Sequence, residues 1–252
     1  MKKYYILTII ISVLILTNCT SSDSDINDKT PKKYYRLVKE TEYNSDGTIE
    51  DILTYSYNEN GYLIKAVEQS GNDILVSNLN YIDNKISSIV YTGNQRIDFI
   101  YENNIISSYT SNLDGDNLVY KFTYNDNNQI INKLAFNEGK LSNERKFKYY
   151  SNGNLAQEIF EYNDGYTFQE DFEYDNKKNP HYLSYPLGLI TIEPISENNV
   201  IKKTRVSSYP TNNKSIITFE YEYNDKGYPI KMIEYVDGDV ENTTEYEYKE
   251  VD

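Results

Sequence analysis

Residues 34–252 contain many short stretches in which apolar and polar side chains alternate with a period of two. In residues 118–124, Leu, Tyr, Phe and Tyr are separated by Val, Lys and Thr, and residues 217–223 follow the same rule. Successive side chains of a β-strand point to opposite sides of its sheet. The pattern therefore predicts strands with one aromatic, apolar face and one charged face. No part of this region shows sustained helical spacing.

A tight-turn signature recurs between these stretches. A tyrosine that ends one strand is followed by Asn, Asp or Gly, and then by the next apolar strand. Copies of the signature begin at Tyr43, Tyr57, Tyr81, Tyr101, Tyr124, Tyr150, Tyr174 and Tyr223. A second set of turns lies between them, for example at residues 70–72 and 237–239. Asn, Asp and Gly tolerate the positive φ of hairpin turns, so two turns per repeat predict two strands per repeat.

The repeats together predict the fold. About eight of them would give roughly 16–18 antiparallel strands in one continuous meander. A flat sheet of that width would leave its apolar face in water, so we expect twist to roll it into a barrel, a half-barrel or a folded-over sheet. An extended ribbon with little enclosed core is the alternative. The predicted class is all-β, with a helix only in the signal peptide described next.

The N-terminal 33 residues differ from the rest of the chain. A positive start at Lys2 and Lys3 precedes an apolar run over residues 4–16, which is shorter than the roughly 20 residues of a membrane-spanning helix. This pattern is typical of a secretory signal peptide, with a true membrane anchor as the alternative. The polar residues 20–33 predict a flexible tether. We therefore divide the chain into a signal peptide (1–18), a tether (19–33) and a single repeat β domain (34–252).

Leu16-Thr17-Asn18-Cys19 resembles the lipobox of bacterial lipoproteins. The resemblance implies that the Cys19 thiol receives diacylglycerol, that the chain is cut before Cys19 and that the new amine is acylated. Several acyl chains anchor a protein stably, because each buried methylene contributes about 0.8 kcal/mol. The resemblance thus implies an outer-membrane lipoprotein of a Gram-negative bacterium, which faces the cell surface or the periplasm and has the membrane as a partner through Cys19.

The repeated Tyr-Asn/Asp-x-x-Gly signature resembles YD/RHS-type repeats, and in particular those of short Bacteroidetes-type surface lipoproteins that are mainly known as domains of unknown function. Tyr174–Pro180 looks like their recurrent YDNKxNP segment, and Ser196–Asn199 looks like the SxNN that follows it. The resemblance covers Tyr43 to Tyr248. Long RHS proteins form shells around toxins. This chain has too few repeats to enclose a toxin, so we do not assign that role to it.

The net charge and the residue counts exclude several kinds of partner and active site. The formal net charge of −14 should repel nucleic acid. With one histidine and one cysteine, the chain lacks the ligands of a His-based zinc site, and it has no glycine-rich phosphate loop. We expect no catalytic residues, no metal site and no cofactor. Glu220 and Glu222 alternate with aromatic residues, which indicates a solvated polar face more than a catalytic carboxylate pair.

Residues 179–194 break the pattern, because they hold three of the six prolines. Proline does not occupy central strands, so this is a long excursion from the sheet. Long loops on rigid sheets often carry binding sites, and His181, Tyr182 and Tyr185 are the candidate ligand-binding residues here. The favoured alternative is that the apolar residues of the excursion plug or cap one end of the rolled sheet.

Two functions follow from these observations. The first is a non-catalytic, membrane-anchored binding or structural module of the cell envelope, expected to be a monomer, with a glycan or a protein as its ligand. Tyrosine-rich faces suit such ligands, because tyrosine offers contact area at low entropic cost. The second is a carbohydrate-active enzyme that uses a carboxylate pair in a cleft of the sheet.

Overall fold

The computed structural model describes residues 34–113, 117–182, 184, 189, 192–208 and 213–251. The predicted signal peptide, Cys19 and the tether lie outside these residues, as does Tyr185. The all-β prediction is confirmed, because the described residues form strands joined by turns and contain no α-helix. Within the same residues, no helix is long and apolar enough to cross a membrane.

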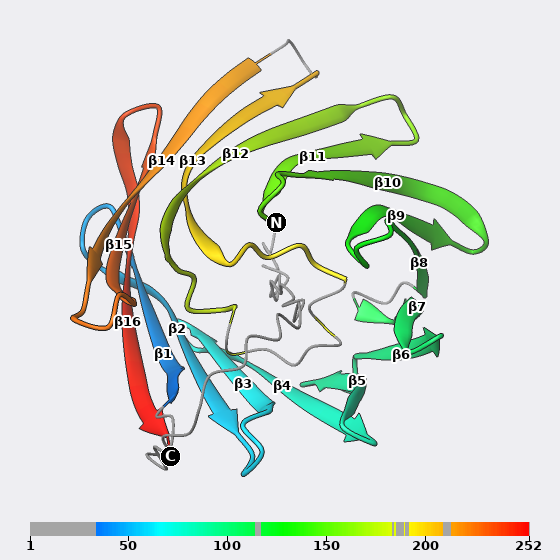
Figure 1. Ribbon diagram of the computed structural model, residues 1–252, viewed down its shortest axis with the longest axis horizontal. Coiled ribbons are helices and arrows are strands. Elements are labelled where there is room, and N and C mark those ends of the chain that lie inside the picture. Colours follow the sequence, from blue (N-terminus) through cyan, green and yellow to red (C-terminus); the bar gives the residue numbers. More distant parts are fainter. Residues whose placement is uncertain are drawn as a thin grey trace, which may run out of the picture.

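The strands form one closed antiparallel barrel in which each strand pairs with its neighbours in sequence, and the last strand pairs with the first. Figure 1 shows the strands following one another around the ring in the order of the chain. The sixteen strands are β1 (Tyr34–Asn44), β2 (Ile49–Tyr57), β3 (Leu63–Ser70), β4 (Asp73–Ile82), β5 (Lys85–Tyr91), β6 (Arg96–Glu102), β7 (Ile105–Ser111), β8 (Leu118–Tyr124), β9 (Ile130–Asn137), β10 (Lys140–Tyr149), β11 (Leu155–Tyr162), β12 (Thr167–Lys178), β13 (Asn198–Ser207), β14 (Asn213–Tyr223), β15 (Pro229–Val236) and β16 (Asp239–Val251). Of the predicted forms, the closed barrel is the observed one.

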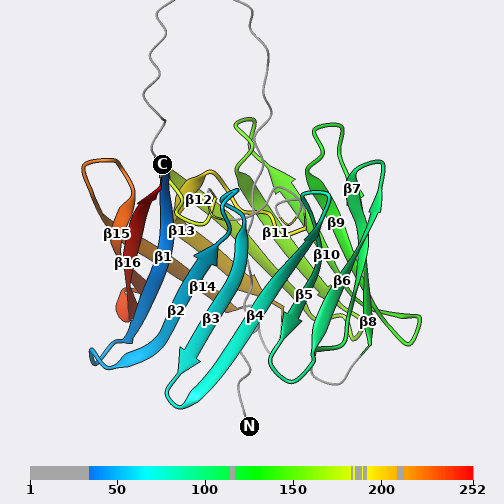
Figure 2. The same cartoon turned by 90° about the horizontal axis from the view of Figure 1, so that it is seen from below.

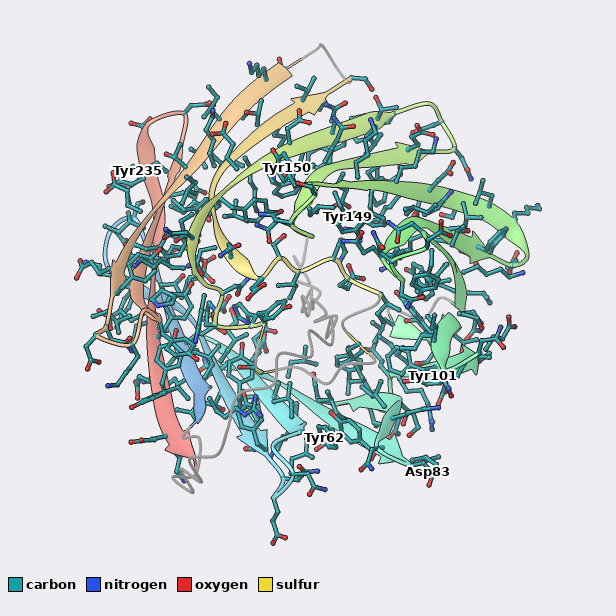
Figure 3. All side chains as sticks on the ribbon, viewed as in Figure 1. Tyr62, Asp83, Tyr101, Tyr149, Tyr150 and Tyr235 are labelled. Atoms are coloured by element: carbon teal, nitrogen blue, oxygen red, sulfur yellow. The ribbon has the colours of Figure 1, made fainter. Side chains whose placement is uncertain are left out.

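The wall of the barrel has an aromatic inner face and a charged outer face, as the alternation predicts. In the pairing of β6 with β7, Phe99 lies opposite Tyr109, and both pack into the core. On the outer face, Lys39 of β1 lies opposite Glu247 of β16, and their side chains form an ion pair of 2.7 Å. Figure 3 shows the same division for two labelled tyrosines, since Tyr149 lies toward the interior and Tyr235 on the outside.

The two ends of the barrel differ. One end, which we call the tyrosine end, carries the turns that follow Tyr57, Tyr81, Tyr101, Tyr124, Tyr149 and Tyr223. At each of these turns the chain reverses after an even-numbered strand, and β16 ends at the same end of the barrel (Figure 2). The opposite end carries the other set of hairpin turns, beginning with the β1–β2 turn. The two turn sets of the sequence thus lie at opposite ends, except that the Tyr43 copy of the tyrosine signature forms the β1–β2 turn.

A ladder of tyrosine hydroxyls holds the tyrosine end together. Near the end of an even-numbered strand, a tyrosine donates to a backbone carbonyl of the preceding odd-numbered strand, at 2.6–2.9 Å. The donor and acceptor pairs are Tyr57–Leu37, Tyr81–Leu63, Tyr101–Ile86, Tyr124–Ile106, Tyr149–Ile130, Tyr221–Val200 and Tyr248–Pro229. Most of the acceptor residues are almost fully buried. A phenolic ring suits this place, because its apolar body fills the core while its hydroxyl satisfies a buried carbonyl.

Candidate functional site

The excursion between β12 and β13 enters the barrel. In Figure 1 its described parts continue the yellow-green ribbon from the wall into the interior. At its base, the Asn179 backbone N–H donates to the Glu197 carbonyl at 2.9 Å, and the Leu155 N–H of β11 donates to the Ser196 hydroxyl oxygen at 2.9 Å. These bonds hold both ends of the excursion against the wall. We call the described residues of this stretch, 179–182, 184, 189 and 192–197, the inner segment.

Apolar residues of the inner segment form part of the main core. Leu189, Ile192 and Ile195 are at most 4% exposed and pack in one cluster with residues of β1 to β7, including Leu37 and Ile106. Full burial of one such side chain contributes about 1.5–3 kcal/mol. The inner segment therefore fills part of the interior, as the favoured sequence interpretation expected.

Two of the predicted ligand-binding residues, His181 and Tyr182, lie inside the barrel, and Tyr185 is outside the described residues. His181 places its Nε2 at 3.4 Å from Oε2 of Glu40 on β1, and Glu40 also accepts a hydrogen bond from the Tyr55 hydroxyl. Tyr182 is 7% exposed. Burial lowers the pKa of His181, but the Glu40 carboxylate outweighs burial, so the net pKa is raised and the protonated form is favoured. These contacts connect the inner segment to β1.

A second ionic contact connects the inner segment to the other side of the barrel. Glu193 pairs with Lys133 of β9, and its second oxygen lies 3.4 Å from Nη1 of Arg145 on β10. Arg145 also pairs with Glu158 of β11. Burial alone would raise the pKa of Glu193, but the two cations outweigh it and keep that pKa below its ordinary value. The inner segment is thus fixed at two separate points of the wall.

The inner face near the opposite end carries a group of acids that the sequence interpretation missed. Glu42 is two residues beyond Glu40 on β1, so it also faces inward, and it lies opposite Asp51 of β2. Glu68 of β3 lies opposite Leu53, another inward residue. Glu234 of β15 lies opposite Phe219 and completes the group. We call Glu42, Asp51, Glu68 and Glu234 the acidic patch.

Electrostatics within the acidic patch are unfavourable. Burial, the largest cause, acts together with the neighbouring acids Glu50, Asp51, Glu234 and Glu40 to raise the pKa of Glu42 from 4.5 to about 7. Burial, with Asp51 in support, also raises the pKa of Glu68. A carboxyl group whose pKa lies near neutrality can carry a proton or a bound cation at little cost.

Comparison with known proteins supports the fold alone. No family model matches the sequence, and no curated protein matches it. Among solved structures, a porin-like protein from Bacteroides uniformis is similar, with a TM-score of 0.59 and 13% identity over 84% of this chain and 98% of the other. A porin-like protein from Bacteroides vulgatus has a TM-score of 0.61 and 10% identity over 86% of this chain and 99% of its own. The chain shares its barrel fold with these two proteins.

Proposed function

We propose that this protein is a non-catalytic lipoprotein of the cell envelope, anchored through acylated Cys19, whose barrel stands in water as a binding module. The observation that carries the proposal is the outer face of the barrel. Ion pairs between neighbouring strands lie on the outer face in three sectors of the wall: Lys39–Glu247, Lys146–Glu161 and Lys202–Glu173. A barrel that spans a bilayer needs an apolar outer band about 25 Å tall, and a Lys or Arg at its midplane costs about 2–4 kcal/mol.

The filled interior supports a role in binding over one in transport. Leu189, Ile192 and Ile195 occupy the core from within, and the contacts of His181 and Glu193 fix the inner segment at two points of the wall. Porin-like structural relatives from Bacteroides fit a location in the envelope of a Gram-negative bacterium. In this proposal the acyl chains on Cys19 attach the protein to the membrane, because the charged outer wall of the barrel cannot insert into the bilayer.

The carbohydrate-active alternative has one observation in its favour. Glu42, with its pKa raised to about 7, lies opposite Asp51 on the neighbouring strand, and glycosidases use one protonated and one ionised carboxyl group. Hydrolysis of chromogenic aryl glycosides by the soluble domain, abolished in Glu42→Gln, would support this alternative. Full retention of that hydrolysis in the variant would place the activity elsewhere.

The anchoring proposal is tested by Cys19→Ala in the full chain, expressed in a Gram-negative host. We expect the wild-type protein to stay with membranes after an alkaline carbonate wash, because its acyl chains are inserted in the bilayer. The variant should appear in the wash as a folded β protein by circular dichroism. Ser22→Ala in the tether is the matched control and should behave as wild type. Membrane retention of Cys19→Ala would show that the barrel itself is embedded and would overturn the proposal.

A further inference from the structure

The acidic patch contains buried acceptor oxygens without partners. Among the described residues, five buried side-chain polar atoms have no hydrogen-bond partner, and three of them belong to this region: Asp51 Oδ1, Glu68 Oε2 and Asn242 Oδ1. Asp51 is only 8% exposed. An unpaired buried acceptor is costly, because it has lost its bonds to water, so a native structure rarely keeps several together without a purpose.

The register directs these oxygens to one place on the inner face. Asp51 of β2 lies opposite Glu42 on one side and Ser70 on the other, two residues from the Leu53–Glu68 pair. On the next strands, Asn242 lies opposite Glu234 and donates its Nδ2 to that carboxylate at 3.4 Å. This bond leaves the Asn242 Oδ1 as an acceptor. All of these positions lie near the opposite end of the barrel, close to the β1–β2 turn.

The patch also lacks the counter-charges that the rest of the inner face has. On the facing wall, Arg205 donates to Glu170 at 2.8 and 3.0 Å, and Arg145 pairs with Glu158. Near the acidic patch, the described inward positions of β15, β16, β1, β2 and β3 hold Thr, Asn, Ser and apolar residues beside the acids, but no Lys or Arg. The protein therefore compensates its inward charges on the facing wall, and pairs Glu40 with His181, but leaves the acidic patch without a cationic side chain.

We propose that the acidic patch binds an organic cation with several alkylammonium groups, such as a free oligoamine or the lysine side chains of a basic peptide. The inference deepens the proposed binding role and rests on it. Each ammonium group offers three donors, which matches an array of carboxylate and amide oxygens that lack donors. Among the described residues no three acidic or histidine side chains are grouped to hold one metal ion, so the acceptors suit a ligand with separated donors.

Isothermal titration of the soluble domain at low ionic strength and pH 8 tests the proposal. Spermidine and the peptide Lys-Lys-Lys are the two probes, and they distinguish a free oligoamine from a basic peptide. We expect one saturable site for at least one probe, with affinity falling as salt is added. The double variant Asp51→Asn/Glu68→Gln should weaken binding at least tenfold. Because it removes like charges, this variant should melt at the same temperature as wild type or higher.

The matched control is Glu220→Gln/Glu222→Gln, which removes two charges from the outer face. It should bind the probe as wild type does. Equal weakening of binding in both double variants would show that the effect comes from net charge alone and would overturn the proposal. The absence of saturable binding up to millimolar probe would also overturn it. Binding of Ca²⁺ alone, lost in the patch variant, would show a metal site instead. None of these results decides the proposed function. That function is tested separately by Cys19→Ala and by a pull-down of glycans and proteins with the soluble domain.

Discussion

Substitution of Glu42 by Gln should stabilise the protein above neutral pH. The pKa of Glu42 is about 7 in the folded barrel against an ordinary 4.5, so the folded state holds a proton that the unfolded chain has released between these values. Stability therefore falls as pH rises from 4.5 through 7, and the full cost applies at pH 8. One pKa unit corresponds to about 1.36 kcal/mol, which sets a ceiling of about 3 kcal/mol.

The effective cost is smaller, because Glu42 is only half-buried and solvent screens its charge. We expect Glu42→Gln to raise the free energy of unfolding by about 1–2 kcal/mol at pH 8, or roughly 4 °C in melting temperature. At pH 4.5 the gain should vanish, since Gln then replaces a neutral acid. Thermal unfolding followed by circular dichroism at both pH values measures this. Glu222→Gln, on an exposed outer side chain, is the control and should change stability by less than about 0.5 kcal/mol. A gain that is the same at both pH values would refute the electrostatic reasoning.

Two further predictions concern the interior. His181→Gln should lower stability by about 1–3 kcal/mol at pH 6, where the charged histidine pairs with Glu40, and the loss should shrink as pH rises through the raised pKa of His181. Urea unfolding at pH 6 and pH 9 measures it, and a loss independent of pH would mean that the ion pair contributes nothing. Tyr101→Phe should cost about 1 kcal/mol because the buried Ile86 carbonyl loses its donor, whereas Tyr235→Phe on the outer face should cost less than half of that. Equal costs in chemical denaturation would contradict the role given to the tyrosine ladder.

Local sequence chemistry was enough to predict most of the strands and turns, but the tight turn predicted at Tyr174 is wrong, because residues 167–178 form β12 without a break. The Tyr57 signature forms the expected tight turn, in which Gly61 adopts a φ of +76° and donates to the Asn58 carbonyl. The prediction of roughly 16–18 strands in a meander is confirmed with sixteen. Closure could not be predicted, because the β1–β16 pairing joins Lys39 to Glu247 across nearly the whole domain, and no local pattern specifies such a contact.

The acidic patch could not be predicted from the sequence for a related reason. Strict alternation along β1 would place Leu37, Lys39 and Thr41 on one face, and would leave the intervening glutamates on the other. The register shifts between Leu37 and Lys39, so that Leu37 and the glutamates beyond it share the inner face. A one-residue irregularity thus places Glu40 and Glu42 inside the barrel, on the face opposite to the one that strict alternation from Leu37 would give them. The assignment of Glu222 to the outer face is supported by its approach to Lys231, at 3.9 Å.

In the proposed function, the two ends of the barrel have different roles, one in stability and the other in binding. At the tyrosine end, hydroxyls such as that of Tyr101 satisfy buried carbonyls, and the inner segment packs its apolar residues into the core. At the opposite end, Asp51 and Glu68 keep buried oxygens unpaired among like charges. A marginally stable protein can keep such a cost only where other parts of the fold offset it. The repeated tyrosines therefore explain how the acidic patch can remain available for a ligand without unfolding the barrel that carries it.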